Sequence, residues 1–306
     1  MNLQAKALRE LVAERDARRA PRRTRTVAIG SAAPGVGRAT LAANLAVALH
    51  GAGLRVVLID VTLGLDRPDG VLDLEPRGTL AHVLAGRRRV SQVALDGPGG
   101  LRVVPAGLGI QQFANLTPWQ QQWLWDGFAE LGEATDLVLI DTPSGVGPDA
   151  VSVLAAADEA IVVAGPQPAA VAEAYALIKM IAERNTAATI RLLANRVASP
   201  HEGQGVASRI ARVAQRFLGI HVHLLGTVVD DPAVAEAARR RTPFVVADPA
   251  CQAARCLTAV ATRLRQPAGT RPQRPLADCM RQIAAFQTHS FQAESEHAVD
   301  GKAAQS

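Results

Sequence analysis

The sequence predicts an α/β protein of three layers, in which a mostly parallel β-sheet carries helices on both faces. Short apolar runs rich in Val, Ile and Leu alternate along the chain with longer stretches of helical periodicity. Strands buried on both faces read as continuous apolar runs, and parallel neighbours need a crossover, usually a helix, between them. Hydrophobic residues make up 48% of the 306-residue chain but aromatic ones only 3%. The core of such a fold must therefore be built from aliphatic side chains.

Each element is predicted from its local pattern. Seven short apolar runs are predicted as strands: Thr26–Ser31, Leu54–Asp60, Leu101–Pro105, Asp136–Asp141, Glu159–Gly165, Ile190–Asn195 and His223–Val229. Stretches of helical periodicity lie between and after them: Ala39–Gly51, Pro118–Gly132, Pro148–Ala157, Pro168–Asn185, Gln204–Leu218 and Pro232–Arg240. A last helix of the body is predicted over about Pro249–Leu264, since a proline is tolerated in the first helical turn. These elements define a body that spans residues 26–265.

Residues 1–25 form a separate basic arm. A short amphipathic helix is predicted over residues 3–15, followed by an arginine-rich linker, Arg15–Arg25. Residues 1–26 hold eight cations and three anions, which accounts for the whole formal net charge of +5. The linker is either a solvated spacer or a segment attracted to the phosphates of nucleic acid or lipid. The helix either packs on the body or engages a partner protein.

Residues 266–306 are predicted to hold a proline-rich linker, a short amphipathic helix and a disordered polar tail. The apolar stripe of the helix consists of Leu276, Cys279, Met280, Ile283 and Phe286. Two interpretations stay open: residues 276–287 make a transient membrane contact, or they dock onto the body.

The sequence favours a cytoplasmic protein. No apolar stretch reaches the length that spans a bilayer, and the N-terminus lacks the apolar core of a secretion signal. The three cysteines stand at positions 251, 256 and 279, without histidines at metal-ligand spacing. A small, odd number of cysteines is typical of a reducing compartment.

The stretch GSAAPGVGRAT, Gly30–Thr40, stands between the first predicted strand and the first predicted helix. This is the place of a phosphate-binding loop, where backbone N–H groups at a helix N-terminus point at an anion. Pro34 removes one N–H group from the loop. The residues expected to cradle phosphate are Gly35, Val36, Gly37, Arg38 and Thr40.

Over about residues 26–265 the chain resembles the deviant P-loop ATPases of the MinD/ParA class. The segments that carry the resemblance are Gly35–Gly37, Asn44–Ala46, Val56–Asp60, Leu63–Leu65, Asp136–Gly145 and Leu193–Val197. Within the class the chain is most similar to the flagellar regulators FlhG and FleN. The segments that carry this closer likeness are Gln4–Arg9, Thr79–Gly86, Gly97–Pro105 and Ala174–Lys179.

This resemblance implies a P-loop NTPase-like fold that binds ATP or ADP with Mg²⁺. It adds Asp60 and Asn195 to the cofactor-binding residues, with Asn195 in contact with adenine. It also makes Asp141 the candidate carboxylate near the metal. Both aspartates end predicted strands at the same edge of a parallel sheet, where ligands of such folds bind.

Four positions depart from the family's catalytic pattern. Arg38 replaces the loop lysine, Ala39 replaces the hydroxyl that holds magnesium, and Thr62 replaces the water-positioning aspartate. Ala33 replaces the signature lysine that reaches across a dimer, so a homodimer around ATP is in question. Arginine keeps the charge of lysine but not its compact ammonium. Phosphoryl transfer depends on positioning and charge, so we expect a pseudo-ATPase with no intact catalytic set. Whether nucleotide still binds stays open.

In the FlhG and FleN family an N-terminal Gln-Ala-x-x-Leu-Arg segment stimulates the GTPase FlhF. Here Gln4, Leu8 and Arg9 match it, although Leu3 replaces the acid that usually precedes the glutamine. The resemblance therefore implies a regulator of flagellar number or placement that acts by binding FlhF or another flagellar assembly protein, in the cytoplasm or transiently at the inner membrane face or cell pole.

Two alternatives remain. One is an active ATPase of the same class that positions cargo on a membrane or nucleoid. The other is a pseudo-ATPase that localises a secretion or pilus system. Nucleic acid is an expected partner only in the first of these.

Overall fold

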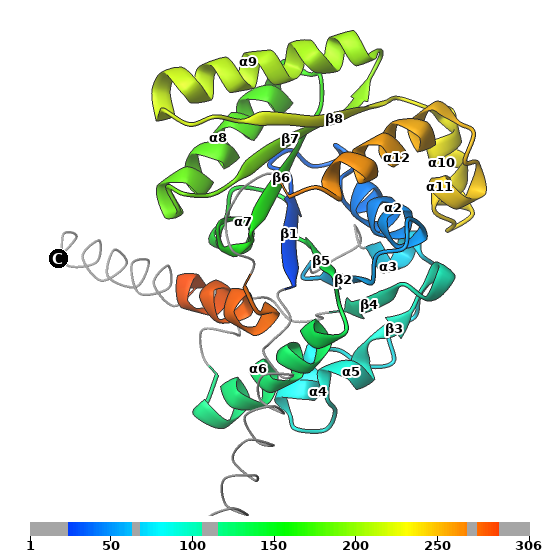
Figure 1. The fold of residues 1–306 in the computed structure, drawn as a ribbon. Helices are drawn as coiled ribbons and strands as arrows, with labels where there is room; N and C mark the ends of the chain where they lie inside the picture. Colours follow the sequence, from blue (N-terminus) through cyan, green and yellow to red (C-terminus); the bar gives the residue numbers. More distant parts are fainter. Residues whose placement is uncertain (1–23, 63–67, 106–115, 268–273, 288–306) are drawn as a thin grey trace, which may run out of the picture.

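The computed structural model describes residues 24–62, 68–105, 116–267 and 274–287, and it contains one eight-stranded sheet (Figure 1). The strands are β1 (Arg25–Gly30), β2 (Val56–Asp60), β3 (Leu95–Asp96), β4 (Arg102–Pro105), β5 (Leu137–Asp141), β6 (Glu159–Ala164), β7 (Ile190–Val197) and β8 (His223–Val229). Their order is β3-β4-β2-β5-β1-β6-β7-β8. Every neighbouring pair is parallel except β3 and β4. The α/β fold predicted from the sequence is confirmed.

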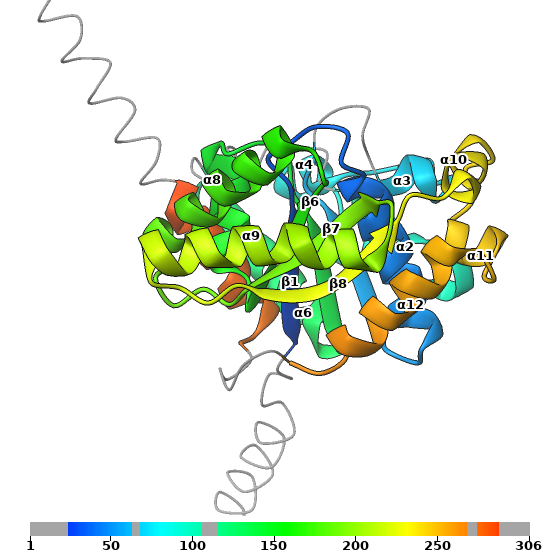
Figure 2. The same ribbon diagram turned by 90° about the horizontal axis from the view of Figure 1, so that it is seen from above.

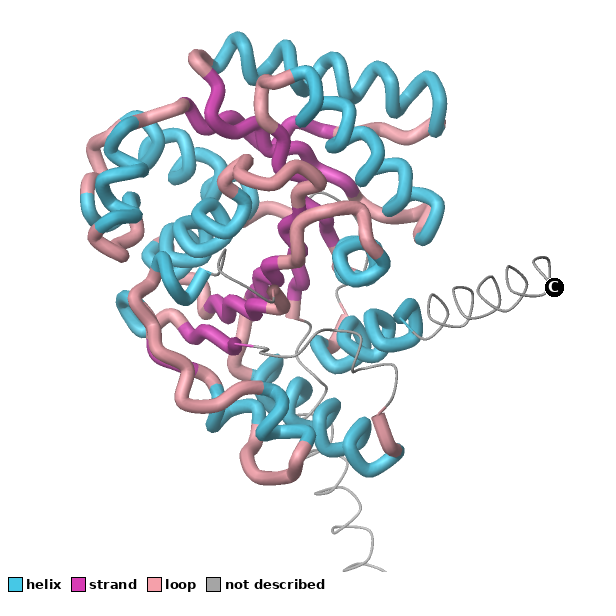
Figure 3. Tube along the Cα trace, turned by 180° about the vertical axis from the view of Figure 1, so that it is seen from behind, coloured by secondary structure: helices cyan, strands magenta, loops and turns pink. Residues whose placement is uncertain are grey.

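Helices connect the strands and cover both faces of the sheet (Figure 2). They are α2 (Arg38–Gly51), α3 (Pro68–Val71), α4 (Leu80–Leu84), α5 (Val90–Val93), the 3₁₀ turn η1 (Pro98–Gly100), α6 (Pro118–Glu133), α7 (Pro148–Ala156), α8 (Pro168–Arg184), α9 (Pro200–Leu218), α10 (Pro232–Arg239), α11 (Phe244–Ala247) and α12 (Gln252–Leu264). A further helix is described over residues 276–287. With the sheet at the centre, Figure 3 shows three layers.

Alternating side chains of each central strand feed two separate cores. On β1, Ala28 packs into the core under α4 to α9, whereas Val27 and Ile29 pack into the core under α2 and α12. Because side chains of a strand point alternately to opposite faces, a wholly apolar strand fills both cores at once. All six residues of β1 are buried. This explains why the apolar runs of the sequence predicted strands reliably.

The element boundaries differ from the sequence predictions at several points. Helix α9 begins at Pro200 rather than Gln204, because the Ser199 hydroxyl accepts a hydrogen bond from the Glu202 N–H and caps the first turn. Helix α12 begins at Gln252, three residues after Pro249. The sequence analysis did not predict α3, α4, α5, β3 or α11, which contain two to five residues each. Elements this short show no measurable periodicity.

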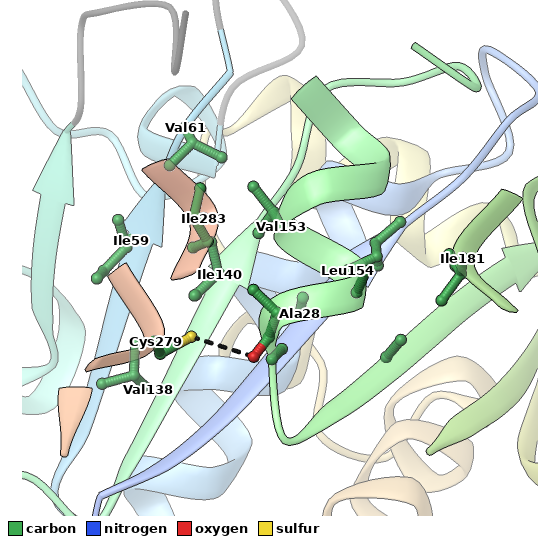
Figure 4. Packing of buried hydrophobic residues seen from close by; sticks show 14 of the residues in the cluster. Ala28, Ile59, Val61, Val138, Ile140, Val153, Leu154, Ile181, Cys279 and Ile283 are labelled. Atoms are coloured by element: carbon green, nitrogen blue, oxygen red, sulfur yellow. Dashed lines mark hydrogen bonds between the residues drawn. The ribbon is translucent and has the colours of Figure 1, made fainter. Parts of the chain in front are cut away.

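The helix over residues 276–287 packs its apolar stripe against the body. Leu276, Met280 and Ile283 are at most 1% exposed and belong to the core beneath α4 to α9. Figure 4 shows Cys279 beside Val138 and Ile283 close to Ile140, both on β5. Of the two interpretations left open by the sequence, this structure contains the docked helix. A membrane contact through the same stripe would require the helix to leave its place.

The start of the described chain lies beside this helix. The Thr24 hydroxyl donates to the Gly132 carbonyl at 2.9 Å, and a Cβ at Gly132 would stand 3.2 Å from the Cβ of Leu276. Arg25 was assigned to the basic linker, but it is the first residue of β1 and is only 4% exposed. Its guanidinium Nε donates to Glu159 at 2.8 Å. Burial lowers the pKa of Arg25, an effect that Glu159 opposes. Arg25 is therefore unavailable to nucleic acid or lipid.

Candidate functional site

The candidate site is the loop between the carboxyl end of β1 and the N-terminus of α2. Ligands of open parallel sheets bind at this edge. Gly37 precedes the first helical residue with φ of 87° and ψ of 21°, a left-handed conformation that glycine adopts without strain. Helix α2 then begins at Arg38, and the described structure has no acidic residue in its first turn. The loop therefore presents the positive end of a helix to the surface.

The side chain of Arg38 turns into the protein and forms a salt bridge with Asp141, the last residue of β5. Arg38 is 4% exposed and Asp141 is 0% exposed. A buried charge is tolerated when it is paired, because pairing offsets the cost of removing both groups from water. The predicted phosphate-binding cation and the predicted metal-binding carboxylate thus neutralise each other.

Asp60 ends β2 directly beside Asp141, since the two residues are register partners in the parallel pair β2–β5. One oxygen of Asp60, Oδ1, accepts two hydrogen bonds from Thr62: from the backbone N–H at 2.9 Å and from the hydroxyl at 2.6 Å. Thr62 is only 5% exposed. The threonine that replaces the expected water-positioning acid is therefore committed to fixing the carboxylate of Asp60.

Asn195, the predicted adenine contact, lies at the end of β7 and reaches the loop. Its Nδ2 donates to the Val36 carbonyl at 2.7 Å. The neighbouring Arg196 donates to the Gly35 carbonyl at 3.3 Å. These two bonds hold the loop against β7.

Two hollows adjoin at the loop, and both are lined by Gly35, Gly37, Thr40 and Ala238. The first, of about 340 Å³, is also lined by Ser31, Val36, Arg38, Ala39, Gly70, Val71 and Ser144. The second, of about 300 Å³, lies between the loop, Asn195 and helix α10. A nucleotide has a phosphate part and a base part, and two hollows that share lining residues suit such a ligand. Ala33 lies outside both hollows and lines another one together with Gln167 and Glu173.

The structure thus gathers the loop residues, Asp60, Asp141 and Asn195 at one edge of the sheet. Gln4, Leu8 and Arg9 lie outside the described residues. Sequence reasoning missed Ser31, a buried residue that lines the first hollow, and Arg196, which donates a hydrogen bond to the loop. Ser31 stands in a run of small residues after β1, and nothing in that run marks it as a site residue. The role of Arg196 becomes visible only once β7 is placed beside the loop.

In the described part of the chain, no group of three or more histidine, cysteine or acidic residues is arranged to hold a metal ion. None of the helices described is long and apolar enough to cross a membrane.

The fold and the loop together define a protein of the MinD/ParA class of P-loop NTPases. The chain belongs to the family described as cellulose biosynthesis protein BcsQ, whose model matches residues 25–264.

Among curated relatives, antiactivator FleN of Pseudomonas aeruginosa is 35% identical over 238 residues, which cover 78% of this chain and 85% of FleN. The flagellum site-determining protein YlxH of Helicobacter pylori is 26% identical over 219 residues, or 71% of this chain and 74% of YlxH. The solved structure of the septum site-determining protein MinD with Mg-ADP, from Pyrococcus horikoshii, superposes with a TM-score of 0.63. That match has 24% identity and covers 80% of this chain and 98% of MinD. The predicted likeness to the MinD/ParA class and to FleN is confirmed.

Proposed function

We propose that this protein regulates flagellar number or placement by binding another protein, and that its ATP hydrolysis is weakened or lost. The flagellar part is supported by the relatives FleN and YlxH, the second of which is named for determining the flagellum site. The loss of hydrolysis is supported by one observation above all, the buried salt bridge between Arg38 and Asp141.

Phosphoryl transfer needs a cation on the transferred phosphate, a metal ion and an oriented water. In this chain Arg38 already neutralises Asp141, and Ala39 has no oxygen to offer a metal. Thr62 is hydrogen-bonded to Asp60. Losing a single charge contact or donor of this kind costs several kcal/mol of transition-state stabilisation. The three departures together leave little of the catalytic apparatus, whether or not ATP or ADP still binds.

The proposed active part is the N-terminal segment, with Gln4, Leu8 and Arg9 engaging an FlhF-type GTPase in the cytoplasm. Thr24 joins that segment to the body at the opposite end of β1 from the loop. The segment therefore joins the body far from the nucleotide site. It can bind its partner protein without a nucleotide in that site. A transient location at the membrane or the cell pole would follow from the partner.

The phosphate-binding loop keeps several features that favour one alternative, an active ATPase of the same class that positions cargo. The loop keeps Gly37, the positive end of α2 and two hollows of suitable size. This alternative predicts magnesium-dependent turnover of ATP by the protein alone, and a homodimer formed with ATP.

The deciding experiment measures GTP hydrolysis by a purified FlhF-type GTPase with full-length protein or with a peptide of residues 1–20. We expect both to stimulate hydrolysis and Gln4→Ala to abolish the effect. Asn2→Ala, which removes a polar side chain just outside the motif, serves as the matched control. Phosphate release from Mg-ATP by the protein alone is followed in parallel. No stimulation together with robust ATP turnover would replace the proposal by the cargo-positioning alternative.

A further inference from the structure

The first hollow has the features of an anion site. It is lined by Arg38, Ala39 and Thr40, the first three residues of the 14-residue helix α2. Their N–H groups have no partner within the helix, because an α-helix leaves its first four donors free. The helix dipole adds a partial positive charge at the same point.

A second observation points to a ligand in the same hollow. Ser31 lines the hollow and is only 1% exposed, and its buried hydroxyl has no hydrogen-bond partner. The Nε of Arg38, another residue that lines the hollow, is also buried without a partner. Buried polar groups are nearly always hydrogen-bonded in folded proteins, so two unsatisfied donors beside one hollow need a group that accepts from them. A phosphate oxygen is such an acceptor.

The same surroundings do not suit a divalent cation. Magnesium requires near-octahedral oxygen ligands, usually several waters together with one or two carboxylates and the phosphates of the substrate. Here no carboxylate lines the hollow, Ala39 supplies no side-chain oxygen, and the side-chain oxygens present are the hydroxyls of Ser31, Thr40 and Ser144. The carboxylate of Asp141 is paired with Arg38. A metal ion in this hollow would lie beside the guanidinium of Arg38, and two cations in contact repel each other.

We propose that the guanidinium of Arg38 takes the place of the divalent cation, so that this site binds the phosphates of a nucleoside diphosphate or triphosphate without metal. Asp141 then competes with the ligand for Arg38. The proposal concerns only the loop and is independent of the partner protein proposed above.

The competition reverses the usual effect of one substitution. In a site that depends on magnesium, removing the carboxylate near the metal weakens nucleotide binding. In this site, Asp141→Asn releases Arg38 to the phosphates and strengthens binding. The sign of the change therefore distinguishes the two arrangements.

The first experiment uses the unmodified full-length chain. ADP is titrated calorimetrically in magnesium and again in EDTA, and Mn²⁺ binding is followed by electron paramagnetic resonance with and without ADP. We expect the two dissociation constants for ADP to agree within about twofold and Mn²⁺ to stay free in solution. A large weakening of ADP binding in EDTA, or Mn²⁺ bound in the presence of ADP, would overturn the proposal. No binding of either ADP or inorganic tripolyphosphate would overturn it too.

The second experiment compares Asp141→Asn with Asp136→Asn, the same change near the other end of β5, where Asp136 pairs with Arg55. We expect Asp141→Asn to tighten ADP binding in EDTA by about tenfold, as one charged hydrogen bond gained implies. Asp136→Asn should leave it unchanged. Weaker or equal binding by Asp141→Asn contradicts the proposal.

Asp141→Asn leaves a buried arginine without its partner and can fail to fold. A double variant, Arg38→Lys with Ala39→Thr, then carries the test, because it restores a compact cation and a metal-binding hydroxyl. We expect ADP binding by this variant to become dependent on magnesium. Binding that is equally independent of metal in the double variant and in the parent would show that Arg38 does not replace the cation.

Discussion

The side-chain amide of Asn195 lies so close to Gly37 that a Cβ at position 37 would stand 2.6 Å from its Nδ2. The same nitrogen donates to the carbonyl of Val36 at 2.7 Å. The end of β7 and the loop after β1 are thus in direct contact through a glycine and an amide. Only glycine leaves room for this contact, and its φ of 87° also disfavours any other residue.

Gly37→Ala is expected to lower the free energy of unfolding by about 1–3 kcal/mol, because it adds backbone strain and displaces Asn195. Urea denaturation measures the loss. Gly35→Ala is the matched control: its φ is also positive, at 71°, but nothing lies within 4 Å of the added Cβ. Equal losses in the two variants would mean that the contact with Asn195 contributes nothing.

Arg38→Met is expected to destabilise the protein by about 3–5 kcal/mol, since it leaves the buried carboxylate of Asp141 without its partner. The double variant Arg38→Met with Asp141→Leu should recover most of that loss, because both charges are then gone. Arg55→Met breaks the half-exposed pair with Asp136 and should cost far less. If the double variant is as unstable as Arg38→Met, the loss does not come from the unpaired charge of Asp141.

Thr62→Val is expected to cost about 1–3 kcal/mol of stability, because it removes a buried hydroxyl that donates to Asp60. Thr62→Ser keeps both donors and should be nearly neutral. Thermal unfolding of the two variants side by side measures the difference. If Thr62→Val is as stable as the unmodified protein, the hydrogen bond from the Thr62 hydroxyl to Asp60 contributes nothing.

Cys279 is expected to resist alkylation in the folded protein. Burial raises the pKa of its thiol to about 12, so the reactive thiolate is almost absent near neutral pH. Cys251 and Cys256 are partly exposed and should react first with iodoacetamide, as mass spectrometry of the labelled protein would reveal. Rapid labelling of Cys279 at neutral pH would mean that residues 276–287 leave the body readily.

The raised pKa of Cys279 also predicts how stability depends on pH. The thiol keeps its proton in the folded state at a pH where the unfolded chain, with a pKa near 9.0, loses it. Its contribution is therefore fully present below pH 9 and is lost progressively between about pH 9 and pH 12. Cys279→Ser should remove this part of the alkaline loss. Denaturation midpoints measured from pH 8 upward test the difference.

Ile283→Ala is expected to destabilise the protein by about 2–4 kcal/mol, since the side chain is fully buried against the body. Arg281→Ala, on the exposed side of the same helix, is the control. For the same reason the unmodified protein should not sediment with anionic vesicles. Vesicle binding that is lost when the chain is ended after Pro275 would show that the helix leaves the body for a membrane.

The central sheet could be predicted because strands buried on both faces leave a strong local pattern. All seven strands expected from apolar runs are present. Of the seven helices predicted in the body, six start and end within three residues of the predicted positions. The exception, α9, begins four residues early, because a serine cap was not recognised. Short segments such as α5 and β3 depend on packing and turn geometry that the sequence does not display.

The position of the candidate site could be predicted from the sequence, but the salt bridge inside it could not. The loop, Asp60, Asp141 and Asn195 converge as expected, since their strands end at one edge. The salt bridge between Arg38 and Asp141 joins residues 103 positions apart, and nothing local indicates that the arginine turns inward. The stripe of residues 276–287 was ambiguous for a physical reason: lipid and a protein core select the same apolar spacing.

The six residues of β1 separate Thr24 from the loop by about 20 Å of rigid strand. Thr24 is hydrogen-bonded to Gly132, and Gly132 lies against Leu276. The start of the described chain and the start of the helix over residues 276–287 therefore lie at the same corner of the body. Substitutions that accumulate around the loop leave that corner unaltered. The chemistry at the loop end of β1 can therefore change without moving Thr24, the residue that joins the N-terminal segment to the body.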